Sequence, residues 1–420
     1  MRAAVVEEFG SPPRWTEVPD PVATGRHEAV VDVVAVGLHP RVRSQAAGSH
    51  YTSTDELPLI PGIDGVGRDA EGRLRYFVLR DTVHGSMAQR AVIDVRHSVL
   101  LPPGADPAQV AAVMNPAMSS WIALRQRVGL RAGQSVLVLG ATGNAGAMAV
   151  RVARRLGAGR VIAVGRGAQR MAAADPDAIV ALDDAPDRVA EQLGRAASDV
   201  DVVLDYLWGR PTADALRAIV PARHDDDQKL TWVQIGSVAG TESPIPSAAL
   251  RATRLDIVGS GQGSVPATRI VAELGELLDE VAAGHFTSDV LTMPLSQVGQ
   301  AWLTGTHVPG PRGLTARPRH VWASRCARRI NAGRDRPVRR ARPGDVPVLR
   351  AVRRSAGARP GTTRGSTVTH TATVRQPPGV PRHGRVRRRP SADPCPGRGS
   401  TATSRRARGR TPAGRRRSPA

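Results

Sequence analysis

Cysteine is scarce in this sequence, and so are long uninterrupted runs of apolar residues. The 420 residues include two cysteines, Cys326 and Cys395, and both lie in the last quarter of the chain. The preceding residues therefore have no disulfide and no thiolate metal ligand, which is typical of a protein in a reducing cytoplasm. No run of about 18 apolar residues is present, and the opening residues MRAAVVEEFG lack a long apolar segment. The sequence therefore predicts neither a membrane span nor a signal peptide.

Acidic residues almost disappear after residue 310. Residues 1–310 contain 29 Lys or Arg and 34 Asp or Glu, a net charge of −5, whereas residues 311–420 contain 30 and 3, a net charge of +27. The second segment has no lysine and few large apolar residues, so we expect a disordered basic tail. One interpretation is an out-of-frame or read-through extension without a selected function. A second is an arm that binds RNA or DNA phosphates, although aromatic residues for base stacking are not interleaved with the arginines. A third is a segment that binds a membrane surface.

The residues before the tail fall into two regions with different sequence patterns. The first hundred or so, including residues 27–38, are rich in valine and punctuated by Pro and Gly, which predicts short strands and turns. A helix is then expected from Pro107, with Asp106 as its N-cap. Strands are expected over residues 135–140, 160–165, 201–207, 230–236 and 255–260. Because these apolar strands alternate with helical patterns, the sequence predicts an α/β fold with a parallel sheet covered on both faces.

Three glycines follow the first of these strands directly. They occur as Gly140-Ala-Thr-Gly143-Asn-Ala-Gly146, before a helix whose apolar residues fall on one face. In this position glycines permit a tight turn, close approach of a pyrophosphate to the backbone, and close packing of helix on strand. The spacing alone is a weak signal and also fits a tight turn in another α/β fold, but its context is strong. The expected cofactor-binding residues of this loop are Gly140, Thr142, Gly143, Asn144, Ala145 and Gly146.

The second strand of the parallel sheet ends in arginines rather than in an acid. Gly165 is followed by Arg166, and Arg170 lies one helical turn further on. A free 2′-hydroxyl is normally recognised by Asp or Glu at this point, whereas a guanidinium pairs with a phosphate. The sequence therefore favours NADPH over NADH, with Arg166 and Arg170 as ligands of the 2′-phosphate. The alternative is that both arginines are solvated surface residues.

At this point the sequence resembles a known family, the zinc-free quinone oxidoreductase branch of the medium-chain dehydrogenase/reductase superfamily. The segments that carry the resemblance, in this order, are MRAAVVEEFGSPPRWTEVPDP, VDVVAVGLHPRV, LPLIPGIDGVG, GSMAQRAVID, VLVLGATGNAGAMAV and IGSVAG. The resemblance implies a GroES-like, β-rich catalytic domain and a Rossmann domain with the active site between them. The implied divisions are residues 1–118 for the catalytic domain, 119–262 for the NADPH-binding domain, 263–310 for a segment returning to the catalytic domain, and 311–420 for the tail.

The resemblance also indicates how this chain departs from the zinc-dependent relatives. Those relatives carry Cys where this chain has His39, and His-Glu where it has Ile63-Asp64. A catalytic zinc needs three protein ligands, and these positions supply two at most, so no metal site is expected. His39 then takes the polar position that zinc-free relatives fill with Asn, or it is a structural histidine. Asp64 is interpreted as a structural residue that holds its turn.

The remaining candidate residues follow from the same resemblance. Tyr51 matches a tyrosine at the mouth of the substrate pocket, and Asn115 and Ser119 match a junction that contacts the nicotinamide; caps and packing residues are the alternatives. Tyr51, His39 and Asn115 are therefore the candidate catalytic residues. Ser237, Gly261 and Gln262 follow late strands and are expected, with Ser119, to bind the cofactor. Asp205 is interpreted as a structural acid.

The expected activity is zinc-independent hydride transfer from NADPH to a quinone or an α,β-unsaturated carbonyl, in a cytoplasmic protein that is a homodimer like many relatives. One alternative is a ketone or enoyl-thioester reductase. Another is an NADPH-binding protein with little catalysis, whose tail binds nucleic acid. Relatives close with a short strand, but here the family pattern ends near Gly310. We therefore expect that strand to be lost, and the full chain to be less stable than a shortened variant in which it is restored.

Overall fold

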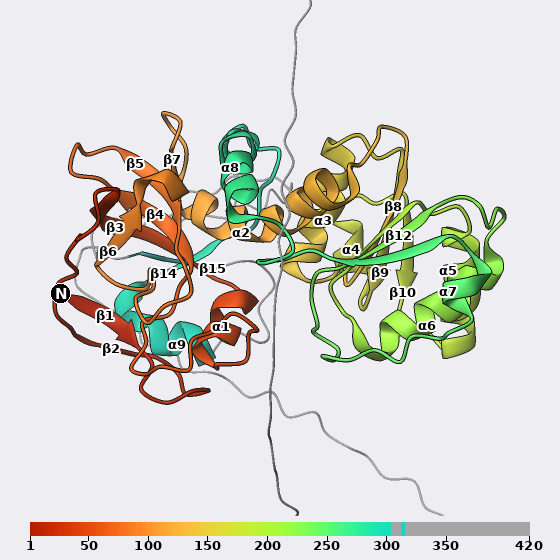
Figure 1. Cartoon of the computed structure of the whole chain (residues 1–420), viewed down its shortest axis with the longest axis horizontal. Helices are drawn as coiled ribbons and strands as arrows, with labels where there is room; N and C mark the ends of the chain where they lie inside the picture. Colours follow the sequence, from red (N-terminus) through yellow and green to blue (C-terminus); the bar gives the residue numbers. More distant parts are fainter. Residues whose placement is uncertain (304–311, 316–420) are drawn as a thin grey trace, which may run out of the picture. The chain divides into compact units, whose positions relative to one another are not determined.

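Apolar runs bounded by glycine and proline become the strands of a parallel sheet. The structure is a computed structural model that describes residues 1–303 and 312–315. The strands of this sheet are β8 (Ser135–Leu139), β9 (Arg160–Gly165), β10 (Ala178–Ala181), β11 (Val202–Asp205), β12 (Leu230–Gln234) and β13 (Leu255–Gly259). Their order is β10-β9-β8-β11-β12-β13, and all pairs are parallel. Figure 1 labels β8, β9, β10 and β12 of this sheet. This is the doubly wound dinucleotide-binding order, as the sequence predicts.

Helices cover both faces of the parallel sheet. They are α3 (Asn144–Arg155), α4 (Ala168–Ala172), α5 (Pro186–Ala197), α6 (Gly209–Ile219), which the 3-10 turn η3 (Val220–Ala222) extends, and α7 (Ala249–Ala252). Along β8, Val136 and Val138 join the hydrophobic cluster that contains α3. Leu137 and Leu139 alternate with them and join the cluster that contains α5 and α6. Because side chains alternate along a strand, a continuous apolar run fits this doubly covered position.

Short strands and turns build a second, mainly antiparallel part, as expected. Its strands are β1 (Arg2–Val5), β2 (Arg14–Glu17), β3 (Glu28–Leu38), β4 (Asp64–Arg68), β5 (Leu74–Val78), β6 (Arg90–Asp94), β7 (Ser98–Leu100), β14 (Leu291–Pro294) and β15 (Arg312–Thr315). The short helices are α1 (Pro40–Ala46), α9 (Val298–Leu303), and the 3-10 turns η1 (Val95–His97) and η4 (Leu295–Gln297). The larger sheet has the order β14-β15-β3-β4-β5-β7, with β6 also paired to β3, and β1 pairs with β2.

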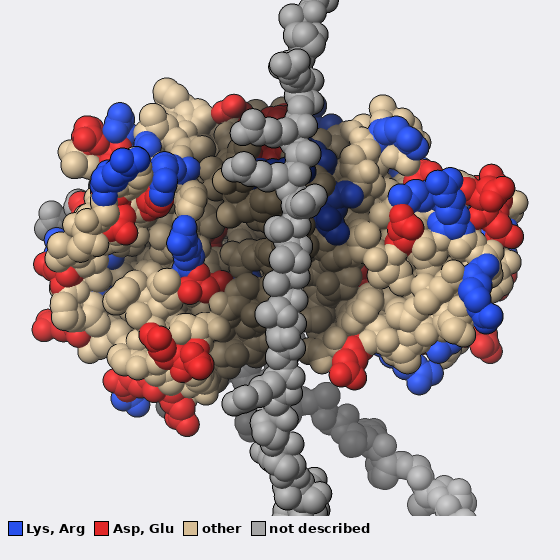
Figure 2. Space-filling model, viewed as in Figure 1, with Lys and Arg blue, Asp and Glu red and all other residues tan. Residues whose placement is uncertain are grey.

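The surface carries charges of both signs. Figure 2 shows basic and acidic side chains interspersed on the face in view, in agreement with the near balance of charge over residues 1–310. Within the described residues, no helix combines the length and the apolar character needed to cross a bilayer.

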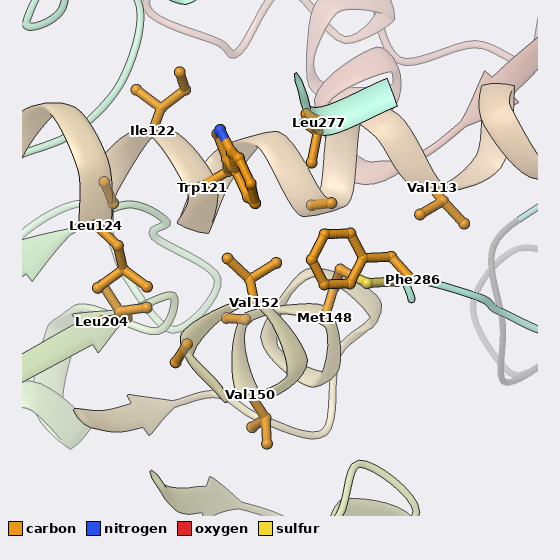
Figure 3. Packing of buried hydrophobic residues seen from close by; sticks show 14 of the residues in the cluster. Val113, Trp121, Ile122, Leu124, Met148, Val150, Val152, Leu204, Leu277 and Phe286 are labelled. Carbon is orange, nitrogen blue, oxygen red and sulfur yellow. The ribbon is translucent and has the colours of Figure 1, made fainter. Parts of the chain in front are cut away.

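A long helix, α2 (Pro107–Ile122), packs against both α3 and α8 (Ala267–Ala282). Asp106 caps it by accepting from the N–H of Ala108 at 2.9 Å, and the π-helical segment η2 (Ala123–Val128) continues it. Trp121 is buried and meets Phe286 edge to face, with ring centroids 6.2 Å apart (Figure 3). Its indole N–H donates to the buried carboxylate of Glu273 on α8 at 2.8 Å. A satisfied polar contact therefore fixes α8 on α2, and an apolar contact fixes the segment that follows α8.

The expected loss of the closing strand is wrong. Strand β15 is present and lies between β14, to which it is parallel, and β3, to which it is antiparallel. Main-chain hydrogen bonds make this pairing, so it does not require the side-chain pattern of the family. The rest of the expected tail, residues 311–420 apart from this strand, lies outside the described residues.

Because β15 is an interior strand of its sheet, we expect its removal to destabilise the antiparallel part. A chain that ends at residue 311 loses the strand that joins β14 to β3, whereas a chain that ends at residue 319 keeps it. The shorter chain should unfold at a temperature lower by several degrees, about 4 °C or more. Calorimetry on the two proteins measures this difference, and equal midpoints would show that β15 contributes nothing to stability.

Candidate active site

The glycine loop lies at the carboxyl end of β8, where the parallel sheet reverses its order. Gly140 has φ +100°, and a β-carbon there would lie 3.1 Å from Tyr206 and Leu207, which follow the neighbouring strand β11. The N–H of Gly140 donates to the carbonyl of Val164 at 2.7 Å. The loops after β8, β9 and β11 therefore meet at the switch point, which is where ligands bind in open parallel sheets.

The third glycine of the loop is required by packing. A β-carbon on Gly146 would lie 2.2 Å from the carbonyl oxygen of Gly140, so only glycine allows α3 to start this close to the turn. A β-carbon on Gly143 would meet nothing nearer than 3.7 Å. Gly143 is the N-cap of α3, and Asn144, Ala145 and Gly146 form the first turn, which contains no acid. Their N–H groups have no carbonyl partner within the helix, which suits an anion.

The two arginines predicted to bind a 2′-phosphate lie beyond the end of β9. Arg166 and Arg170 are exposed, and neither guanidinium has an acidic partner among the described residues. The hydroxyl of Thr142 donates to the carbonyl of Arg166 at 2.8 Å, which ties the glycine loop to this segment. Asp183, which was not predicted from the sequence, accepts from the N–H of Gly167 through its carboxylate at 3.2 Å.

A buried carboxylate fixes the loop after β11. Asp205 is fully buried; its Oδ1 accepts from the N–H groups of Leu207 and Trp208, each at 2.9 Å. Its Oδ2 accepts from the hydroxyl of Thr212 at 2.5 Å and from the indole of Trp232 at 2.9 Å. All four donors are satisfied by one side chain, and Trp208 is held at a φ of +56° that non-glycine residues rarely adopt. Asp205 is therefore structural.

Ser119 connects α2 to the same loop. Its hydroxyl donates to the carbonyl of Pro116 at 2.8 Å and forms a 2.9 Å hydrogen bond with the hydroxyl of Tyr206. Burial raises the pKa of Tyr206 to about 12, so this phenol stays protonated at neutral pH. Ser119 was predicted from the sequence and Tyr206 was not, although a polar residue directly after an apolar strand is a signal.

The loop after β13 meets the antiparallel part. The hydroxyl of Tyr51 donates to the carbonyl of Gln262 at 3.0 Å, and lies 2.7 Å from the position that a β-carbon on Gly261 would take. The side-chain oxygen of Gln262 accepts from Arg41 at 3.4 Å and lies 3.2 Å from the hydroxyl of Thr52. Gln262 is thus engaged by the antiparallel part. Ser237, after β12, is exposed and has no side-chain partner among the described residues.

Next to Tyr51 is a polar cluster that the sequence did not predict. Arg41 forms an ion pair with Asp81, whose carboxylate also accepts from the hydroxyl of Thr52 at 2.6 Å. His50 contacts Thr52 through Nδ1 at 2.9 Å and stacks against Tyr51. Burial, and then the positive charge of Arg41, lower the pKa of His50 to about 4, so the ring is neutral at physiological pH.

His39 and Asp64, the positions matched to zinc ligands in other relatives, are in direct contact. Nε2 of His39 lies 3.1 Å from Oδ1 of Asp64, and the hydroxyl of Tyr76 donates to Oδ2 at 2.8 Å. All three side chains are buried. Within residues 1–303, no cluster of three or more His, Cys, Asp or Glu side chains suited to a metal ion is present.

Asn115 is half-buried on α2, and its amide has no hydrogen-bond partner in the described part of the chain. Among the described residues, no hydrogen bond joins His39, Tyr51 and Asn115 to one another.

Two surface depressions, of about 540 and 310 Å³, lie away from all three residues. The smaller is lined by Gln134, Asp201 and Thr231, near the amino ends of parallel strands, which is the edge opposite to the glycine loop.

Three known proteins are similar to this chain in sequence or in structure. A probable NADPH-dependent quinone reductase of Emericella nidulans is 32% identical over 345 residues, which cover 72% of this chain and 96% of the relative. The structure of the quinone oxidoreductase from Thermus thermophilus, also determined with NADPH, matches with a TM-score of 0.62 and 25% identity over 75% of this chain and 100% of that one. A mycocerosic acid synthase-like polyketide synthase of Mycobacterium tuberculosis is 30% identical over 138 residues, or 32% of this chain and 6% of that protein.

No protein-family model matches the chain. The likeness to the Emericella protein nevertheless extends over nearly all of that relative, and the sheet orders agree with the resemblance in the sequence. The chain belongs to the quinone oxidoreductase family of the medium-chain dehydrogenase/reductase superfamily.

Proposed function

We propose that this protein is an NADPH-dependent oxidoreductase that reduces a quinone or a related enone. The observation that carries the proposal is a close backbone approach in the loop after β8. There Gly146 allows the start of α3 to contact the carbonyl of Gly140. This contact brings a helix N-terminus without acidic residues to the switch point of the sheet. The relatives named as NADPH-dependent quinone reductases add the substrate class.

The residues around this loop fit a phosphorylated dinucleotide. Gly140, Thr142, Gly143, Asn144, Ala145 and Gly146 would hold the pyrophosphate on the first turn of α3. Arg166 and Arg170 would pair with the 2′-phosphate. Ser119, Ser237, Gly261 and Gln262 would border the rest of the molecule, Gln262 through the contacts that hold it to Tyr51 and Arg41. When bound, NADPH supplies a hydride from its nicotinamide ring.

On the acceptor side, we propose His39, Tyr51 and Asn115 as the residues that orient the substrate. Tyr51 lies at the contact between the antiparallel part and the loop after β13. Asn115 lies on α2, one turn before Ser119, and its free amide is available to a ligand.

A second candidate is reduction of an enoyl thioester. It is favoured by the likeness of about a third of the chain to a polyketide synthase. Steady-state rates with NADPH and a panel of quinones, simple enones and enoyl thioesters would rank the two candidates, since a quinone reductase should show its largest kcat/KM with quinones.

We also propose that the protein works in the cytoplasm as a homodimer. The outer edge of β13 ends the parallel sheet, so a second copy has main-chain groups to pair with there. Light scattering would test the dimer, and a mass of one chain would contradict it. Nucleic-acid binding by the tail would rest on composition alone, and we do not propose it.

Replacing Arg166 tests the choice of cofactor. Loss of a charged hydrogen bond to the 2′-phosphate removes about 1.5–3 kcal/mol, so Arg166→Gln should raise KM for NADPH about tenfold or more and leave KM for NADH nearly unchanged. Arg195→Gln is the control, because Arg195 is an exposed arginine on α5 that pairs with Glu191. Equal changes in both KM values would show that Arg166 does not read the phosphate.

Alanine at two glycines of the loop separates packing from cofactor binding. Gly146→Ala places a methyl group 2.2 Å from a carbonyl oxygen, so we expect the melting temperature to fall by about 4 °C or more. Gly143→Ala meets nothing nearer than 3.7 Å, so it should lower the melting temperature less, by the small cost of alanine at an N-cap, but bind NADPH more weakly in calorimetry. Unchanged NADPH affinity in Gly143→Ala would contradict close approach of the nucleotide at this residue.

A further inference from the structure

Three buried side chains form a hydrogen-bonded chain inside the antiparallel part. His39, Asp64 and Tyr76 are exposed by only 6%, 1% and 0%. Asp64 uses both carboxylate oxygens, one toward Nε2 of His39 at 3.1 Å and one toward the hydroxyl of Tyr76 at 2.8 Å. Burial and the nearby carboxylate raise the pKa of Tyr76 well above its ordinary value, so this phenol remains a donor. The carboxylate is therefore fixed from one side and orients the imidazole on the other.

The second ring nitrogen of His39 has no partner. Nδ1 is buried, and no described residue lies within hydrogen-bond distance of it. Leaving a buried polar atom unpaired costs about 1–3 kcal/mol, and native proteins rarely tolerate it without a reason. Because Asp64 binds Nε2, Nδ1 is the ring nitrogen that remains without a partner among the described residues.

The neighbours of His39 place it near the loops of the candidate site. A β-carbon on Gly37 would lie 3.0 Å from Cδ2 of His39 and 2.6 Å from the carbonyl of Ala111, so the imidazole lies close to α2 one turn before Asn115. Two residues after His39, Arg41 reaches Gln262 in the loop that follows β13. The imidazole therefore belongs to the segment that meets the carboxyl edge of the parallel sheet, the edge at which such sheets bind nucleotides.

We propose that His39 donates the proton to the acceptor oxygen through Nδ1, and that Asp64 and Tyr76 are positioning residues for it. This inference rests on the proposed function. Reduction of a quinone to a hydroquinone consumes one hydride, supplied by the nucleotide, and one proton. When the ring carries a proton on both nitrogens, the N–H bond at Nδ1 breaks and an O–H bond forms on the quinone oxygen. His39 is left neutral with its other proton on the Asp64 side, and water restores the first.

The competing donor is Tyr51, and its geometry is less suitable. Its hydroxyl already donates to the carbonyl of Gln262 at 3.0 Å, and the side chain is 70% exposed. A proton leaving Tyr51 would cost that hydrogen bond, whereas a proton leaving Nδ1 of His39 breaks no bond within the described chain.

The first experiment needs neither nucleotide nor turnover. The full chain is labelled with ¹⁵N-histidine, His39→Asn identifies the resonances of His39, and hydroquinone, the product, is added alone. We expect the Nδ1 resonance of His39 to shift on titration. The matched control is His285, whose Nδ1 lies 2.8 Å from Glu280 on the exposed surface, and its resonances should not move. No response at His39 would overturn the inference.

The second experiment measures turnover. His39→Asn should lower kcat with a quinone about 10²-fold or more, the range of general acid catalysis, with little change in KM for NADPH. It should also abolish the solvent deuterium isotope effect on kcat. Asp64→Asn keeps an acceptor for Nε2, so it should lose less activity than Asp64→Ala. His285→Asn should stay within about twofold of the native enzyme.

The outcomes separate this inference from the proposed function. If the native enzyme reduces quinones and His39→Asn keeps both its kcat and its isotope effect, the inference fails and the proposed function stands. If Tyr51→Phe alone abolishes the isotope effect, Tyr51 is the donor and the inference also fails. If the native protein neither binds NADPH nor reduces a quinone, the proposed function fails, and the hydroquinone titration still decides what Nδ1 of His39 contacts.

Discussion

The arrangement of the nucleotide side depends on the missing side chain at Gly146. Because a β-carbon there would lie 2.2 Å from the carbonyl of Gly140, the first turn of α3 comes directly against the turn that ends β8. The same turn is enclosed on its other side by Tyr206 and Leu207, which the buried carboxylate of Asp205 holds in place. One backbone contact and one buried acid therefore fix two loops at the switch point, and free N–H groups face the space above them.

The acceptor side depends on contacts between segments that are far apart in the sequence. Tyr51 and Arg41 bind the loop after β13 through Gln262, and Ser119 binds Tyr206 after β11. Each contact joins the antiparallel part or α2 to a loop at the carboxyl edge of the parallel sheet. A change in any of these loops would therefore shift residues on both the proposed nucleotide side and the proposed acceptor side.

The sequence predicted the elements of the parallel sheet well because their signals are local. Continuous apolar runs end at glycines, Asp106 and Pro107 mark a helix start, and the structure has these elements within a few residues of the expected positions. Strand β10 was not identified, since four residues, Ala178–Ala181, are too short a run to stand out. Strand β15 was expected to be absent, because the side-chain pattern of relatives ends there, although main-chain pairing with β3 and β14 does not depend on it.

Contacts within the candidate site were harder to predict because they cross long stretches of sequence. The glycine loop is a local motif and was found, but the pairing of Tyr51 with Gln262 spans 211 residues and has no local signal. Asp64 was interpreted as holding its own turn, whereas it binds His39, 25 residues away, and Tyr76.

Two charged or polar groups buried together cost desolvation that apolar residues of the same volume would avoid. Zinc-dependent relatives have metal ligands at these two positions, whereas this chain has an imidazole and a carboxylate, and one ring nitrogen has no partner among the described residues. The unpaired nitrogen lowers stability, so the proton transfer proposed for Nδ1 explains the arrangement better than packing does.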